Sequence, residues 1–218
     1  MVGTVTAAPK VEVFAAIQTA AHTAGEDFDY LVRTAMRESS LNPEAKARTS
    51  SATGLFQFIE QTWLATVKKH GDKHGLGLIA DEIKVRADGR HIVPDKALRQ
   101  EILALRKDPE IASRMAAELT ADHRDYLEGR LGRPVSQGEL YAAHFLGPKG
   151  AVDLIRAAQR DPAGAAADLF PDAVRANRSI FYAADGSARS LSDVRARVTR
   201  LPDAPDVPDA PTLPVTCH

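Results

Sequence analysis

Apolar residues recur every three or four positions through most of the chain, which is the pattern of amphipathic helices. Three such stripes lie in the first third of the sequence: Val11, Phe14, Ile17 and Ala21; Phe28, Leu31, Val32 and Ala35; and Leu55, Ile59, Trp63 and Val67. Gly25 ends the first predicted helix, Asp27 caps the second, and Gly71 ends the third. The pattern predicts a mainly α-helical body.

Two start signals predict helices in the second half of the chain. Asp108 is followed by Pro109, which is the order of an N-cap and a first-turn proline. Ser136 and Glu139 have the spacing of a capping box, ahead of an apolar stretch. Shorter helices are expected over 149–159, 172–178 and 191–200.

One stretch alternates apolar and polar residues with the period of a β-strand. Asp88-Gly89 lies at its centre, with Ile83, Val85 and Ala87 before it and His91 and Val93 after it. Alternation around an Asp-Gly pair predicts a small β-hairpin. Such a hairpin in a helical body is either a flap beside a cleft or an elaborated loop, and the sequence leaves both interpretations open.

The two ends of the chain differ from this body. Residues 1–9 are small and polar and are expected to be a disordered leader. After residue 200, prolines recur at every third position, with aspartates between them. This spacing suits an extended polyproline II segment, and the segment has little apolar surface to bury. We expect a folded domain over 10–200 and an extended tail over 201–218, the alternative for the tail being a proline-rich recognition ligand.

Composition excludes several classes of protein. The 218 residues include 28 Lys and Arg against 29 Asp and Glu, and the net charge of −1 is not that of a strongly basic nucleic-acid-binding protein. No apolar run reaches the roughly 20 residues that span a bilayer, and no signal peptide is visible. Cys217 is the only cysteine, so an intramolecular disulfide is impossible. We expect a monomer that binds no nucleic acid and has no transmembrane segment.

Glu38 is the strongest candidate for a catalytic acid. The second predicted helix contains Glu38 and must end by Asn42, because Pro43 disfavours helical angles in the residue before it. Glu38 therefore lies in the last helical turn, where unpaired carbonyl groups disfavour a negative charge. An apolar neighbourhood would add to this effect and favour the protonated carboxyl that general acid catalysis requires. The alternative is a solvated glutamate at a helix end.

Gln57 is a second candidate, and it follows a loop of small polar residues at 47–53. In the third predicted helix, Leu55 and Ile59 face the core, which leaves Gln57 on another side of the helix. A side-chain amide there can donate to and accept from an amide or hydroxyl of a ligand. The alternative is a surface glutamine or a cap.

These two regions together resemble the lytic transglycosylases of the goose-type lysozyme-like superfamily, whose catalytic unit is the SLT domain. Those enzymes combine a catalytic Glu-Ser pair with a Gly-Leu-Met-Gln motif further along the chain. The pairs here read Glu38-Ser39 and Gly54-Leu55-Phe56-Gln57, and Trp63 supplies the aromatic residue that the family has in that helix. The resemblance implies a lysozyme-like helical fold with Glu38 as the catalytic residue.

The resemblance also suggests substrate-binding residues. Ser39, Gln57 and Phe58 belong to the first block, 28–70. Downstream, the family's Ala-Tyr-Asn-x-Gly motif has its best counterpart in Ala143-His144-Phe145-Leu146-Gly147, where His replaces Tyr and Phe replaces Asn. His144 is expected to hydrogen-bond to Glu38 or the sugar, the alternative being a satisfied, partly buried histidine. Tyr182 matches a tyrosine that lines the family's cleft, the alternative being a core aromatic.

The implied activity needs one carboxylate. In the resembled enzymes, a glutamate protonates the glycosidic oxygen between N-acetylmuramic acid and N-acetylglucosamine, and then helps the muramic C6 hydroxyl to close a 1,6-anhydro ring. The positioned internal nucleophile replaces the water of an ordinary two-carboxylate glycosidase. Neither matching motif contains a second acidic residue.

The resemblance implies no cofactor and no metal, and the remaining histidines show no metal-ligand spacing. The expected partner is the glycan strand of peptidoglycan, which implies a periplasmic or cell-wall location. The alternatives are a hydrolytic muramidase on the same fold and a non-catalytic glycan-binding or assembly protein.

Overall fold

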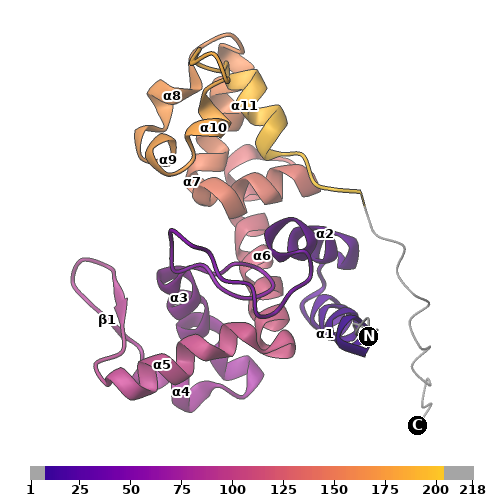
Figure 1. Cartoon of the computed structure of the whole chain (residues 1–218), viewed down its shortest axis with the longest axis vertical. Helices are drawn as coiled ribbons and strands as arrows, with labels where there is room; N and C mark the ends of the chain where they lie inside the picture. Colours follow the sequence, from indigo (N-terminus) through magenta and orange to yellow (C-terminus); the bar gives the residue numbers. More distant parts are fainter. Residues whose placement is uncertain (1–7, 204–218) are drawn as a thin grey trace, which may run out of the picture. The chain divides into compact units, whose positions relative to one another are not determined.

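The computed structural model describes residues 8–203, without the side chains of residues 8, 9 and 176. The described chain is mainly α-helical with one small antiparallel sheet, so the predicted fold class is confirmed (Figure 1). Most of the predicted leader and tail lies outside these residues, at 1–7 and 204–218. Within them, no helix is both long and apolar enough to cross a membrane. The body divides into two compact units, 8–118 and 119–201, which are described separately below.

The first unit contains five helices, two single 3₁₀ turns, the hairpin and the first part of a sixth helix. In chain order they are α1 (Ala8–Ala24), α2 (Phe28–Ser39), α3 (Glu60–His70), η1 (Gly71–His74), α4 (Gly77–Glu82), β1 (Lys84–Val85), β2 (His91–Ile92), α5 (Lys96–Ala104), η2 (Leu105–Lys107) and α6 (Pro109–Leu131). The predicted caps at Asp27 and Asp108 are confirmed: Asp27 Oδ1 accepts from the Tyr30 N–H at 3.0 Å, and Asp108 Oδ1 from the Ile111 N–H at 2.9 Å.

The face that α1 buries overlaps the predicted stripe in part. Ile17 and Ala21 are at most 2% exposed, as predicted, and Val13 and Ala20 are buried with them, whereas Val11 is 46% exposed. The buried face is therefore rotated slightly about the helix axis relative to the prediction. A run rich in alanine offers several nearly equal apolar faces, and packing against α2 selects one of them.

The third helix is shorter than predicted, because it begins at Glu60 and not near Leu55. Residues 52–56 are all buried, and five consecutive buried residues extend around every side of a helix, which does not fit one apolar face of an amphipathic helix. The stretch is instead a tight turn, closed by a bond from the Thr53 N–H to the Phe58 carbonyl. The sequence pattern predicted a helix here because buried loop residues and core-facing helix residues have the same composition.

The predicted hairpin is confirmed. Lys84 pairs with Ile92 and Val85 with His91, and the turn carries Gly89 at a φ of 79°. Its base is fixed to α3 by a reciprocal pair: the His91 N–H donates to Gln61 Oε1 at 3.0 Å, and Gln61 Nε2 donates to the His91 carbonyl at 2.9 Å. The hairpin is therefore an anchored extension of the first unit.

The second unit is built around the later part of α6 and α7 (Gln137–Arg160). The capping box of Ser136 and Glu139 is confirmed. α7 is kinked at Gly147 and so consists of two helical segments, which agrees with the two helices predicted for this stretch. Arg133 donates to both carboxylate oxygens of Glu139, at 2.8 and 3.0 Å. The remaining helices are α8 (Ala166–Leu169), α9 (Pro171–Ala176), α10 (Arg178–Phe181) and α11 (Leu191–Val198).

The core of the second unit is one continuous apolar cluster. It joins α6, α7, α10 and α11, and α11 packs along α7. Its most buried large members are Leu127, Leu154, Phe181, Val194 and Val198.

A buried ionic cluster joins the end of α3 to α6 inside the first unit. His70 Nδ1 lies 3.0 Å from Glu118 Oε2, His74 Nε2 lies 2.9 Å from Glu118 Oε1, and Lys73 Nζ lies 3.1 Å from Glu118 Oε2. Burial by itself would raise the pKa of Glu118, but hydrogen bonds from His74 and Lys73 and the nearby His70 hold that pKa below its ordinary value.

This cluster predicts acid-sensitive stability. Because the pKa of Glu118 is lower in the folded chain than in the unfolded one, its contribution is complete above the ordinary value of 4.5 and is lost as the pH falls through the folded value. We expect Glu118→Gln to be less stable than wild type at pH 7 and to lose less stability between pH 7 and strong acid. Urea unfolding at a series of pH values measures this. Parallel pH profiles for the two proteins would contradict it.

Candidate functional site

Glu38 lies in the last turn of α2, as predicted, and is partly exposed. The helix ends immediately after it because Ser40 and Leu41 both adopt left-handed backbone angles, with φ of 54° and 63°. The Ser40 N–H donates back to the carbonyls of Ala35 and Met36. The carboxylate therefore lies at the negative end of a closed helix, one residue before a sharp turn.

Ser39 connects this helix end to the second motif. Its Oγ donates to the Ala35 carbonyl at 3.0 Å, within α2, and lies 2.9 Å from the Leu55 carbonyl, which it can also bond. Leu55 is fully buried. The hydrogen bond to Leu55 therefore joins the Glu38-Ser39 pair to the Gly54–Gln57 turn, and the structure brings together two motifs that are separate in the sequence.

Gln57 lies at the tip of that turn with a left-handed φ of 48° and is not in a helix. Its Nε2 donates to the Gly54 carbonyl at 2.9 Å and to the Ala45 carbonyl at 3.2 Å. The donor half of the amide thus closes the turn and ties it to the preceding loop. This position corrects the expectation of a glutamine projecting from a helix.

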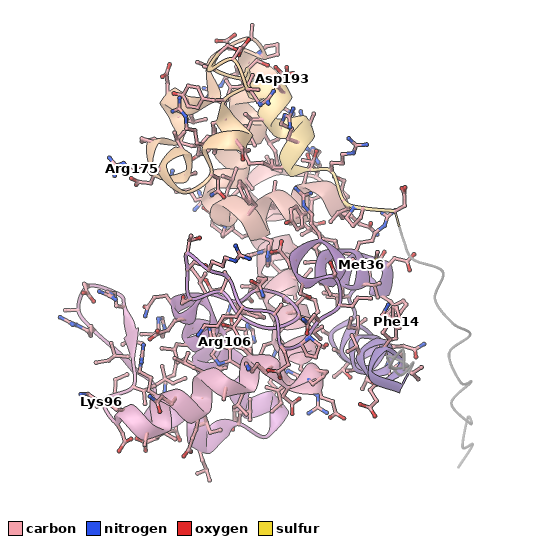
Figure 2. The ribbon with its side chains drawn as sticks, in the orientation of Figure 1. Phe14, Met36, Lys96, Arg106, Arg175 and Asp193 are labelled. Atoms are coloured by element: carbon pink, nitrogen blue, oxygen red, sulfur yellow. The ribbon has the colours of Figure 1, made fainter. Side chains whose placement is uncertain are left out.

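Arg106 binds the segment 51–58, which contains the turn. The Nη1 of Arg106, which is labelled in Figure 2, donates to the Ser51 carbonyl at 2.6 Å and to the Phe58 carbonyl at 2.9 Å. One guanidinium therefore binds both ends of the segment. Gly54 packs against the Arg106 backbone so closely that a Cβ on Gly54 would lie 1.9 Å from the Arg106 carbonyl oxygen. Sequence reasoning missed Arg106, since Leu105-Arg106-Lys107 reads as an ordinary basic surface run.

Phe58 belongs to the core. It is 3% exposed, and its ring packs edge-on against Trp63 with a centroid separation of 5.1 Å. The Trp63 indole in turn donates to the Ile102 carbonyl at 2.8 Å. Phe58 therefore packs in the core beside Trp63, and its assignment as a substrate contact stays a prediction.

His144 lies in the second unit, on α7, and is partly buried. Its ring stacks on Tyr141, with the centroids 5.6 Å apart and the planes at 28°. It also faces another histidine: burial, together with His144, lowers the pKa of His123 to about 4, so His123 is neutral at physiological pH. The expected contact between His144, in the second unit, and Glu38, in the first, stays a prediction.

Tyr182 is half-buried at the end of α10, beside the core of the second unit. The Arg178 guanidinium lies 4.3 Å from the centre of its ring, a cation–π arrangement. A β-bridge to Ala188 fixes its backbone. The environment accounts for Tyr182 as a packed aromatic, and its assignment to a cleft also stays a prediction.

A comparison with protein-family models matches residues 15–79 to a family described as "Transglycosylase SLT domain". The resemblance to lytic transglycosylases is confirmed for this segment. The matched residues include Glu38-Ser39 and Gly54–Gln57, and the SLT domain is lysozyme-like. The match ends before Arg106, His144 and Tyr182, so it includes the catalytic candidate and the turn but not the residue that clamps the turn.

Gly54, within the matched segment 15–79, should not tolerate a side chain without a loss of stability. Gly54→Ala combines a left-handed φ of 83° with a clash against a backbone carbonyl. We expect a loss of about 2–4 kcal/mol in the free energy of unfolding. Gly89→Ala is the matched control, because Gly89 has a φ of 79° and nothing within 4 Å of an added Cβ. Chemical denaturation measures both variants, and an equal loss in the two would contradict the close contact with Arg106.

Proposed function

We propose that this protein is a lytic transglycosylase that cleaves the β-1,4 bond between N-acetylmuramic acid and N-acetylglucosamine in peptidoglycan. The observation that carries the proposal is the SLT match over residues 15–79, which contains a Glu-Ser pair at a helix end hydrogen-bonded to the Gly54–Gln57 turn. The substrate class places the protein's action outside the cytoplasm, in the periplasm or at the cell wall.

In this proposal Glu38 is the single acid and base. The protonated carboxyl gives its proton to the glycosidic oxygen as the bond to the muramic anomeric carbon breaks. The carboxylate then takes the proton of the muramic C6 hydroxyl while that oxygen bonds to the anomeric carbon. Glu38 ends protonated as it began, and no water is consumed.

The positioned C6 hydroxyl explains why one carboxylate suffices. An internal nucleophile needs no bound water and no general base aimed at that water, and it gains from proximity. Two acidic residues near the turn in the sequence have cationic partners: Glu44 pairs with Lys107, and Glu60 accepts from Nε and Nη2 of Arg99. The proposal gives neither of them a catalytic role.

The product distinguishes this function from a hydrolytic muramidase on the same fold. A transglycosylase releases muropeptides with a 1,6-anhydromuramoyl end, which are lighter by one water than the hydrolysed products. Mass spectrometry of fragments released from purified cell wall measures this difference. Reducing muramic ends alone would show a muramidase, and tight binding to the wall without released fragments would show a glycan-binding protein.

Glu38→Gln tests the role of the carboxyl. Gln keeps the shape of the side chain but cannot deliver a proton, and losing general acid–base catalysis costs about a hundred- to ten-thousand-fold in rate. We expect release of anhydromuropeptides to fall by that factor while circular dichroism and the melting temperature stay at wild-type values. Glu44→Gln is the matched control on the exposed side of the same region and should retain activity. Full activity of Glu38→Gln would remove Glu38 from the mechanism.

A further inference from the structure

Arg106 is a buried cation that binds backbone and not carboxylates. The residue is 7% exposed and lies in the short turn η2 between α5 and α6. Its Nε donates to the Leu103 carbonyl at 2.8 Å, which fixes the guanidinium plane against its own turn. Its Nη1 donates to the Ser51 and Phe58 carbonyls at 2.6 and 2.9 Å. A planar fork with fixed donors suits three acceptors in fixed directions, whereas a lysine ammonium does not.

The carbonyls that Arg106 binds are the two ends of the segment 51–58. Between them the chain runs through Gly54 and Gln57, and the Gly54 Cα rests against the Arg106 backbone. Within the segment, the Thr53 N–H bonds the Phe58 carbonyl at 3.3 Å and the Gln57 N–H bonds the Gly54 carbonyl at 3.2 Å, and the Gly54 N–H bonds the Ala45 carbonyl at 2.8 Å. Arg106 adds the hydrogen bonds that join both ends of the segment to η2.

The same segment carries the acceptor for Ser39. The Leu55 carbonyl, in the middle of the clamped stretch, lies 2.9 Å from Ser39 Oγ, one residue after Glu38. A displacement of the segment therefore moves the partner that ties down the last turn of α2. Hydrogen bonds connect Arg106 to the catalytic candidate in two steps, through the segment and through Ser39.

We propose that Arg106 is a positioning residue for the reaction: it sets the place of the 51–58 segment and, through Ser39, of the helix end that carries Glu38. This inference rests on the proposed function. It extends the functional unit beyond the matched segment 15–79 to a residue that contacts neither the substrate nor the reacting atoms.

The experiment compares Arg106→Met, Arg106→Lys and wild type in the full chain. Met keeps the apolar stem and removes every donor, and Lys keeps the charge but not the fork. Arg114→Met is the matched control, because Arg114 is also in the first unit and pairs with Glu110 at the surface of α6. Two readouts are taken: kcat and KM for release of anhydromuropeptides, and amide hydrogen exchange followed by mass spectrometry.

We expect Arg106→Met to lose about 10- to 100-fold in kcat, the effect of a small misplacement of a catalytic group, with KM within about twofold of wild type. Arg106→Lys should retain more of kcat than Arg106→Met, and Arg114→Met should retain all of it. Exchange in Arg106→Met should quicken in peptides that contain residues 45–58 and stay unchanged in peptides from α1 and α11.

Three results would overturn the proposal. The first is wild-type kcat in Arg106→Met. The second is unchanged exchange over 45–58, and the third is faster exchange throughout the first unit, which marks a general loss of stability. A wild-type protein that releases no fragments from cell wall would overturn the proposed function instead. The exchange measurement would then still decide whether Arg106 holds the segment.

Discussion

The arrangement of the candidate site depends on one buried guanidinium. Arg106 binds the carbonyls at both ends of the 51–58 segment and adds a charge-assisted hydrogen bond to each of them, beside the bonds that these carbonyls accept from Thr53. Burial lowers the pKa of Arg106, and Glu60 opposes that effect from nearby, so the group remains charged and its hydrogen bonds remain charge-assisted. An irregular segment with three nearly consecutive buried apolar residues needs such a partner, because it lacks the hydrogen bonds of a helix or a sheet.

The positions of the other residues of the candidate site depend on this segment. The fixed segment presents the Leu55 carbonyl to Ser39, and Ser39 in turn holds the last turn of α2. Ser40 and Leu41, which follow this turn with left-handed backbone angles, each cost about 1–2 kcal/mol of folding free energy. The surrounding contacts must offset this strain. Strained turns of this kind are common where a side chain must be presented at a fixed angle. Glu38 is thereby placed at a helix end that neither frays nor continues.

The second unit is organised by other means. Glu139 satisfies its own helix start and accepts from Arg133, and the hydrogen bonds from Arg133 lower the pKa of this carboxyl despite its burial. The apolar cluster around Phe181 then fixes the short helices that carry Tyr182. His144 and Tyr182 are accordingly held by contacts within their own unit, the first by Tyr141 and the second by Arg178.

The sequence by itself determined the helical class, the caps at Asp27, Asp108 and Ser136, the hairpin at Asp88-Gly89 and the place of Glu38 in a last helical turn. Each of these is decided within a few residues, by capping hydrogen bonds, by turn geometry or by the block that Pro43 sets on a helix. Only the tertiary structure decided that 54–59 is a turn, that Phe58 is core, and that Gln57 closes the turn. Those outcomes depend on Arg106, 48 positions beyond Phe58 in the chain, and no local pattern records a partner at that distance.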